Sequence, residues 1–119
     1  MRKGLILVCV FFCLGSCTDS SKIPSSIIPK DKMEKVLWDM MLADRYSAQY
    51  LLRDSASRNV KVETMKLYEQ VFQIHKISQA EFVKSFKYYL NRPDITKVIF
   101  DSLAARGNRN RDTLYKIMK

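Results

Sequence analysis

Glycine, proline, cysteine and histidine are scarce in this 119-residue chain, which contains three glycines, three prolines, three cysteines and one histidine. So few glycines and prolines disfavour a β-rich fold, because such folds depend on many tight turns. No glycine-rich loop that would cradle a phosphate is present, and no set of polar residues has the spacing of a catalytic motif. The sequence therefore favours an all-α protein that is not an enzyme and binds no cofactor.

The longest apolar run lies near the start of the chain and has the features of a signal peptide. Arg2 and Lys3 precede eleven mainly apolar residues, 4–14, as in secretory signals. A helix of that length spans ~16 Å whereas a bilayer core is ~30 Å thick, so the run is too short to cross a membrane. It ends in Leu-Gly-Ser-Cys at residues 14–17. This ending resembles the bacterial lipobox, which is an aliphatic residue, two small residues and a cysteine.

The lipobox implies a specific modification of Cys17. Cleavage falls before this residue, its thiol receives a diacylglycerol, and its freed amine is acylated with a fatty acid such as palmitate. Residues 1–16 are then the signal peptide, and two or more acyl chains anchor the mature protein stably to a membrane. We favour the periplasmic face of the outer membrane, with surface display as an alternative. An ordinary signal peptide followed by a chance cysteine is the alternative to the lipobox.

The use of cysteine agrees with lipidation. Cys9 and Cys13 leave with the signal peptide, so Cys17 is the only cysteine of the mature chain. A single cysteine forms no internal disulfide and offers no paired thiolates to a metal. Acylation uses up this thiol, and we expect no metal site.

Basic residues outnumber acidic ones. The chain holds 21 Lys and Arg against 12 Asp and Glu, and loss of Arg2 and Lys3 with the signal peptide leaves a net charge of +7. Such a charge often indicates nucleic-acid binding, but an exported lipoprotein rarely meets nucleic acid. Attraction to anionic lipid head groups or acidic glycans suits the compartment better. Solubility alone also explains the charge.

Residues 17–29 are predicted to be the lipidated cysteine and a short flexible tether, and residues 30–119 a helical domain with a basic C-terminal segment. Apolar residues recur in this domain at the helical period. Asp31 and Glu34 suit the cap of a first helix, which fades into the polar stretch 54–59 before a second helix. The stripe of the first helix is Met33, Val36, Leu37, Met40, Met41, Ser47, Ala48 and Leu51, and that of the second is Val62, Met65, Tyr68, Val71, Phe72 and His75.

The clearest local signal is Ile-Ser-Gln-Ala-Glu-Phe at residues 77–82. Ser78 and Glu81 have the spacing of a capping box, with Ser78 as the N-cap of a third helix. Ile77 before the cap and Phe82 after it match the accompanying hydrophobic staple. Two helices are therefore predicted to meet here at a tight bend.

The C-terminal third of the chain is predicted to begin with the end of the third helix, just before Pro93. Proline suits the first turn of a fourth helix, which is predicted to end near Gly107. The basic segment 107–119 either forms a short docked turn or frays. The complete domain is predicted to be a small all-α bundle of about four helices.

The pattern of this domain resembles a known family. Its elements, in chain order, are Pro29, Met33, Leu37, Asp39, Tyr68, Phe72, Phe82, Ser85, Tyr88, Tyr89 and Pro93. Together with the lipobox, they resemble domain-of-unknown-function family 4296, small lipoproteins of Gram-negative bacteria, over roughly residues 28–103. The resemblance implies a fold and an envelope address but no reaction. Members often carry histidine at the position of Met41, which weakens a histidine-based site here. They often carry glycine at that of Lys76, which calls a left-handed helix cap there into question.

Aromatic residues are the candidate binding residues. Trp38, Tyr88 and Tyr89 are predicted to belong to a recognition surface, because aromatic residues and arginine dominate binding hot spots. The alternative is that they close the edge of a small core. The leading hypothesis is a non-enzymatic, membrane-anchored helical module that binds another envelope protein.

Two other functions are compatible with the sequence. The first is an envelope enzyme or enzyme subunit that uses Ser85 or His75, because a serine nucleophile needs a base within reach. The second is a chaperone-like helical scaffold, because methionine side chains adapt to varied partners. Its methionines would be Met33, Met40, Met41 and Met65.

Overall fold

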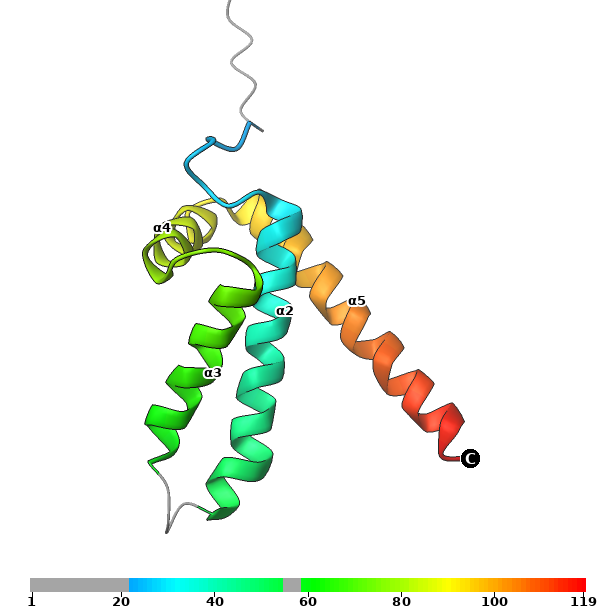
Figure 1. The fold of residues 1–119 in the computed structure, drawn as a ribbon. Helices are drawn as coiled ribbons and strands as arrows, with labels where there is room; N and C mark the ends of the chain where they lie inside the picture. The colour runs from blue at the N-terminus through cyan, green and yellow to red at the C-terminus, as the bar shows by residue number, and fades with distance from the viewer. Residues whose placement is uncertain (1–21, 55–58) are drawn as a thin grey trace, which may run out of the picture.

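The computed structural model describes residues 22–54 and 59–119 and shows an all-α protein (Figure 1). Within these residues no strand is present, and the predicted bundle of about four helices is confirmed. The predicted signal peptide and Cys17 lie outside the described residues. The α-helices are α2 (Lys30–Tyr46), α3 (Val60–Ile74), α4 (Gln79–Leu90) and α5 (Pro93–Ile117). A π-helical turn, Ser47–Leu51, and a 3₁₀ turn, Leu52–Asp54, continue α2.

Helices α2 and α3 lie side by side and run in opposite directions (Figure 1). Hydrogen bonds join them along their length. The hydroxyl of Tyr68 donates to Asp44, and that of Thr64 donates to Ser47 Oγ at 3.0 Å. This helical hairpin supports the other two helices, since α4 crosses its upper end and α5 packs against α2.

The bend between α3 and α4 has the predicted geometry. Ser78 Oγ accepts the backbone N–H of Glu81 at 3.1 Å, and the Glu81 carboxylate accepts that of Ser78 at 2.7 Å, so the capping box is confirmed. Phe82 is buried, and Ile77 packs against the same core. Because of the staple and the capping box, only residues 75–78 separate the end of α3 at Ile74 from the start of α4 at Gln79.

Lys76 adopts the left-handed conformation, with φ of 50°. The doubt raised by the absence of glycine was therefore wrong. The backbone N–H of Ile77 donates to the Phe72 carbonyl at 3.0 Å and that of Lys76 to the Gln73 carbonyl at 3.1 Å, which is the Schellman pattern. These bonds satisfy carbonyls at the end of α3, and they offset the ~1–2 kcal/mol that a left-handed residue with a Cβ costs.

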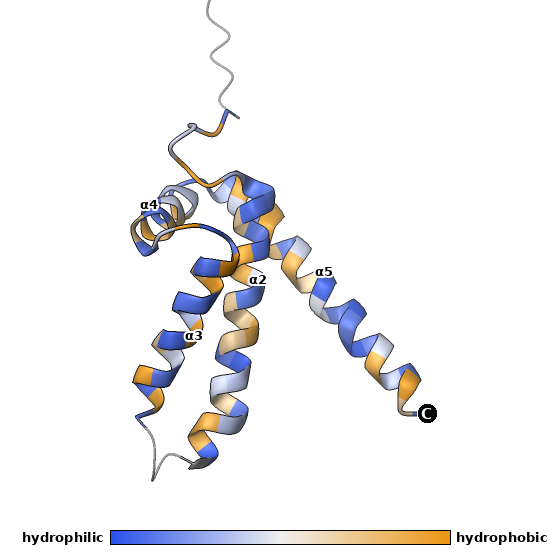
Figure 2. Ribbon diagram, viewed as in Figure 1, coloured by the Kyte–Doolittle hydropathy of each residue, from blue (hydrophilic) through white to orange (hydrophobic). Residues whose placement is uncertain are grey.

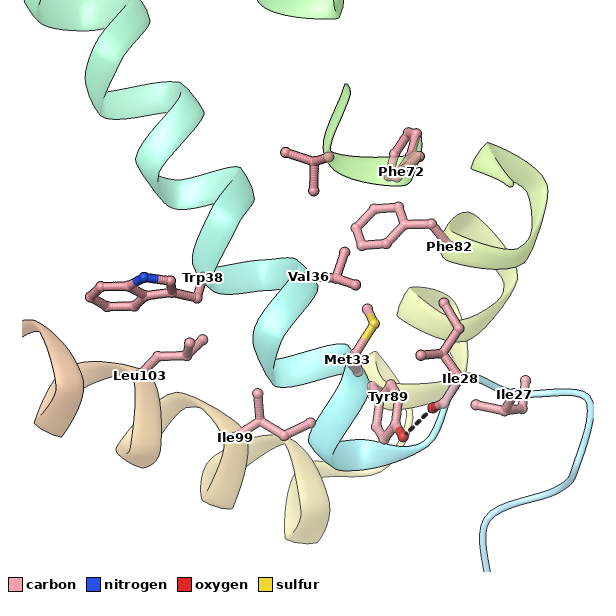
Figure 3. Packing of buried hydrophobic residues seen from close by; sticks show 11 residues of the cluster. Ile27, Ile28, Met33, Val36, Trp38, Phe72, Phe82, Tyr89, Ile99 and Leu103 are labelled. Carbon is pink, nitrogen blue, oxygen red and sulfur yellow. Dashed lines mark hydrogen bonds between the residues drawn. The ribbon is translucent and has the colours of Figure 1, made fainter. Parts of the chain in front are cut away.

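The hydrophobic core lies where α2 meets α4 and α5 (Figure 3). Met33 and Val36 on α2 are completely buried, and Ile99 and Leu103 of α5 pack on the same helix. Phe72 and Phe82 close the side toward α3 and α4. Because these residues come from all four helices, the core fixes the position of the first half of α5 relative to α2.

The chain before α2 is part of this core. Ile27 and Ile28 are buried, so the prediction that both residues belong to the tether was wrong. Ser85 Oγ on α4 accepts the backbone N–H of Ile28 at 2.9 Å, and the hydroxyl of Tyr89 donates to the Ile28 carbonyl at 2.7 Å (Figure 3). Both polar backbone groups of Ile28 are thereby satisfied inside the protein, and residues 27–28 form a strap across α4.

The start of α2 differs from the prediction. Pro29 is its N-cap residue and no side chain caps the helix, so the expected cap by Asp31 and Glu34 was wrong. Asp31 lies in the first turn, where a negative charge complements the helix dipole. Glu34 instead accepts a hydrogen bond from Ser102 Oγ at 2.6 Å and so joins α2 to α5.

Helix α5 continues to Ile117, so the prediction that it ends near Gly107 was wrong. Glycine inside a helix costs about 1 kcal/mol relative to alanine, which weakens a helix without ending it. No left-handed glycine occurs among the described residues. The second half of α5 leaves the bundle (Figure 1) and carries a hydrophilic stretch followed by apolar residues at its end (Figure 2).

Candidate binding cleft between α2 and α5

The divergence of α2 and α5 leaves a cleft with a volume of about 400 Å³. Leu103 is the last buried residue of α5, and beyond it the two helices separate (Figure 1). The walls are formed by Trp38, Met41, Leu42 and Arg45 of α2 and by Gly107, Asn108, Asn110, Arg111 and Leu114 of α5. Apolar and basic side chains therefore share one open cavity.

Trp38 links the cleft to the core. Its side chain is only 7% exposed and lies beside Leu103 in the core (Figure 3), yet it also lines the cleft. The guanidinium of Arg106 lies 4.4 Å from the centroid of the Trp38 rings, within the range of a cation–π interaction. This contact places a positive charge next to the apolar floor.

The apolar side chains at the mouth of the cleft are unusually exposed for their size. Leu42 is 43% exposed, and Leu114 on the opposite wall is 60% exposed. Tyr46 follows Leu42 by four residues, so it lies one turn further along the same side of α2. Its ring is 5.0 Å from that of Tyr50, and both rings are exposed. The apolar surface therefore continues from the cleft toward the π-helical turn.

The end of α5 is strongly basic. Residues 104–119 hold five basic side chains and one acidic side chain, Asp112. Within the described part of the chain, none of the five forms an ion pair with a carboxylate. Arg45 adds a further positive charge from the opposite wall. The five are Arg106, Arg109, Arg111, Lys116 and Lys119.

The structure does not bring the three predicted binding residues together, because only Trp38 lines the cleft. Tyr89 is 3% exposed and bonds to Ile28, and burial raises the pKa of its hydroxyl to about 12. Tyr88 is half-buried, and its hydroxyl accepts a hydrogen bond from Arg92 at 3.1 Å. From α4, Tyr89 therefore holds the Ile27–Ile28 strap, and Tyr88 packs against the core.

The two residues of the enzyme hypothesis bond to different partners. Ser85 is completely buried and accepts the Ile28 N–H. His75 ends α3 and is half-buried, with Nε2 2.7 Å from Asp39 Oδ2 on α2. In residues 22–54 and 59–119, no three His, Cys, Asp or Glu side chains gather in a way that would hold a metal ion.

Most of the cleft was not predicted from the sequence, because α5 was expected to end near Gly107. The sequence does contain a signal for the longer helix, which is the helical period. Spacings of four, three and four residues separate Gly107, Arg111, Leu114 and Met118. Following that period beyond the glycine would have placed Leu114 on the same face as Gly107. The divergence of α2 and α5 depends on tertiary packing, so no periodic pattern in the sequence indicates it.

The fold and cleft define a small all-α protein with an open, basic groove between two splayed helices. The chain belongs to the family described as Domain of unknown function (DUF4296), whose model matches residues 24–113. Neither the curated proteins nor the solved structures include a match to it. Across the described residues, no helix is both long enough and apolar enough to cross a membrane.

Proposed function

We propose that this protein is a lipid-anchored, non-enzymatic binding module of the cell envelope, and that its α2–α5 cleft holds a segment of another envelope protein. The observation that carries the proposal is the cleft itself. It combines a tryptophan floor, exposed leucines on both walls and several arginines. Aromatic residues and arginine are enriched where binding energy concentrates.

The energy of such binding would come from the exposed leucines and methionine. Burial of apolar surface contributes about 25 cal/mol per Å², and Met41, Leu42 and Leu114 are all exposed in the free protein. The core already fixes Trp38, so little conformational entropy is lost when a partner covers its free edge. A rigid floor with adaptable walls suits a protein ligand.

Photo-crosslinking tests the cleft directly. A photoreactive amino acid at position 42 is expected to trap a discrete partner in living cells. Position 83 on α4 is the matched control, because Val83 is 40% exposed and Leu42 is 43% exposed. Equal crosslinking at both positions, or none at position 42, would contradict the proposal. A broad smear of products at position 42 would favour the chaperone-like scaffold.

The lipid anchor is tested separately. Residues 14–17 support it through their resemblance to a lipobox. Intact mass of the mature protein is expected to show a chain that starts at Cys17 and carries the added mass of acyl chains. A Cys17→Ser variant is expected to move from the membrane fraction to the aqueous fraction. A mature chain that begins elsewhere, or that carries an unmodified thiol, would refute the anchor.

An enzyme that used Ser85 would first have to open the bundle. Ser85 is completely buried beneath the Ile27–Ile28 strap, and its Oγ is already an acceptor for the Ile28 N–H. A substrate would reach it only if the strap left α4. The open cleft needs no such rearrangement, which is why we favour binding over catalysis.

A further inference from the structure

The shape of the cleft limits what kind of protein segment it accepts. Met41 and Leu42 form one wall, and Leu114 forms the other. An extended segment between them would find no strand edge to join among the described residues. Its backbone N–H and C=O groups would therefore depend on water and on the Asn108 and Asn110 side chains for partners. A helix satisfies its own backbone groups and presents apolar side chains to both walls. The geometry therefore favours a helix lying between α2 and α5.

The charges on both walls determine the chemistry of that helix. Arg45 on α2 faces the cleft across from Arg111 on α5, and Arg106 lies over Trp38. Because residues 104–119 have a net charge of +4, a basic or neutral helix would leave these positive charges uncompensated. An acidic helix would pair with them from both sides.

We propose that the α2–α5 cleft binds an acidic amphipathic α-helix of the partner protein. This inference rests on the proposed function, because it names the partner's chemistry for the same cleft. The apolar face of the helix packs on Trp38, Leu42 and Leu114, while its flanking Asp and Glu residues pair with Arg45 and Arg111. The exposed apolar residues at the end of α5 extend the contact.

Binding would also stabilise the second half of α5. This part of the helix contains Gly107, Asn108 and Asn110, which are weak helix formers, and the residues after Leu103 are not buried against the bundle. A helical segment of about 14 residues is marginally stable alone in water. An acidic helix in the cleft would supply the tertiary contacts that this segment lacks.

The test uses the full-length chain in its own cells, with the photoreactive residue at position 42. Mass spectrometry then identifies the crosslinked partner peptide. We expect a segment of net negative charge whose apolar residues recur at helical spacing. An Arg45→Glu/Arg111→Glu variant is expected to lower the crosslinking yield about tenfold, because both residues line the cleft and the change replaces two attractive charges with two repulsive ones. Yield is also expected to fall as salt is raised in cell extracts.

A variant with the same change in net charge is the control. Lys84 and Lys87 are exposed on α4, away from the cleft residues, so Lys84→Glu/Lys87→Glu is expected to leave the yield unchanged. Circular dichroism of each variant checks that the fold is retained. A crosslinked peptide that is basic or lacks helical spacing would overturn the inference but leave protein binding intact. A lipid adduct or a second copy of this chain would overturn the inference and would also contradict the proposal that the cleft holds another envelope protein. Failure to trap anything at position 42 would instead refute the proposed function.

Discussion

Ser85→Ala is the most direct test of how the Ile27–Ile28 strap is held. Ser85 has no exposed surface, and its Oγ is 2.9 Å from the backbone nitrogen of Ile28, whose N–H it accepts. Alanine removes this acceptor and leaves a buried N–H unpaired. An orphaned buried donor costs ~1–3 kcal/mol. For a domain of this size, each kcal/mol lowers Tm by ~4–8 °C, so we expect Tm to fall by roughly 5–20 °C.

Thermal unfolding followed by circular dichroism measures this effect. Ser26→Ala is the control, because Ser26 is an exposed serine of the same segment and surface substitutions usually change stability by less than about 0.5 kcal/mol. Tyr89→Phe removes the other hydrogen bond to Ile28, and we expect the double variant to lose less than the sum of the single losses. An unchanged Tm in Ser85→Ala would refute the strap. If that variant also lost its function in cells, the enzyme hypothesis would gain support.

Three further predictions concern the second half of α5, the contact between Arg106 and Trp38, and the hydroxyl of Tyr89. Gly107→Ala is expected to stabilise the second half of α5 by about 1 kcal/mol, because an added Cβ meets nothing within 4 Å. Amide exchange there would slow about fivefold without a change in α2, and equal slowing in both would contradict a local effect. Arg106→Ala is expected to lower the free energy of unfolding by about 0.5–2 kcal/mol, because it removes the contact with Trp38. Urea unfolding measures this loss, with Arg109→Ala as the control. Equal losses in the two variants would contradict the prediction. Because Tyr89 has a pKa of about 12 in the folded protein against about 10 when unfolded, the unfolded state loses this proton first. The free energy of unfolding is therefore expected to fall between pH 10 and 12. Urea midpoints should decline less steeply in Tyr89→Phe, and parallel declines would refute the assignment.

Local signals predicted the elements whose structure is decided by near neighbours in the chain. Ser78 and Glu81 bond to each other across three residues, so their spacing alone indicated the start of α4. Pro93 likewise marked the start of α5, where it occupies the first turn. The helical period predicted part of the buried face of α2, including Met33 and Val36, but its stripe also contained the exposed Met41 and lacked the buried Trp38.

Distant contacts decided the features that sequence reasoning missed. Ile28 bonds to Ser85 and Tyr89, which lie 57 and 61 residues away, and no local pattern distinguishes it from a tether residue. Lys76 is the exception, because local hydrogen bonds at the end of α3 hold its left-handed conformation although it is not glycine. Trp38 was identified as a candidate, but its position in the cleft depends on where α5 leaves α2.

The strap also affects which surface a lipid anchor would turn toward the membrane. Ile27 and Ile28 are held in the core, and Ile23 also packs against it. The chain from Cys17 to Ile23 would therefore reach about 20 Å at most if it were fully extended. The strap lies at the end of the bundle where α5 begins, and the second half of α5 points away from that end (Figure 1). A basic amphipathic segment often binds an anionic membrane surface. In this fold, however, an anchored chain would carry the strap end nearest the bilayer and hold the α2–α5 cleft toward the aqueous side. That arrangement favours an acidic protein segment over lipid head groups as the ligand of the cleft.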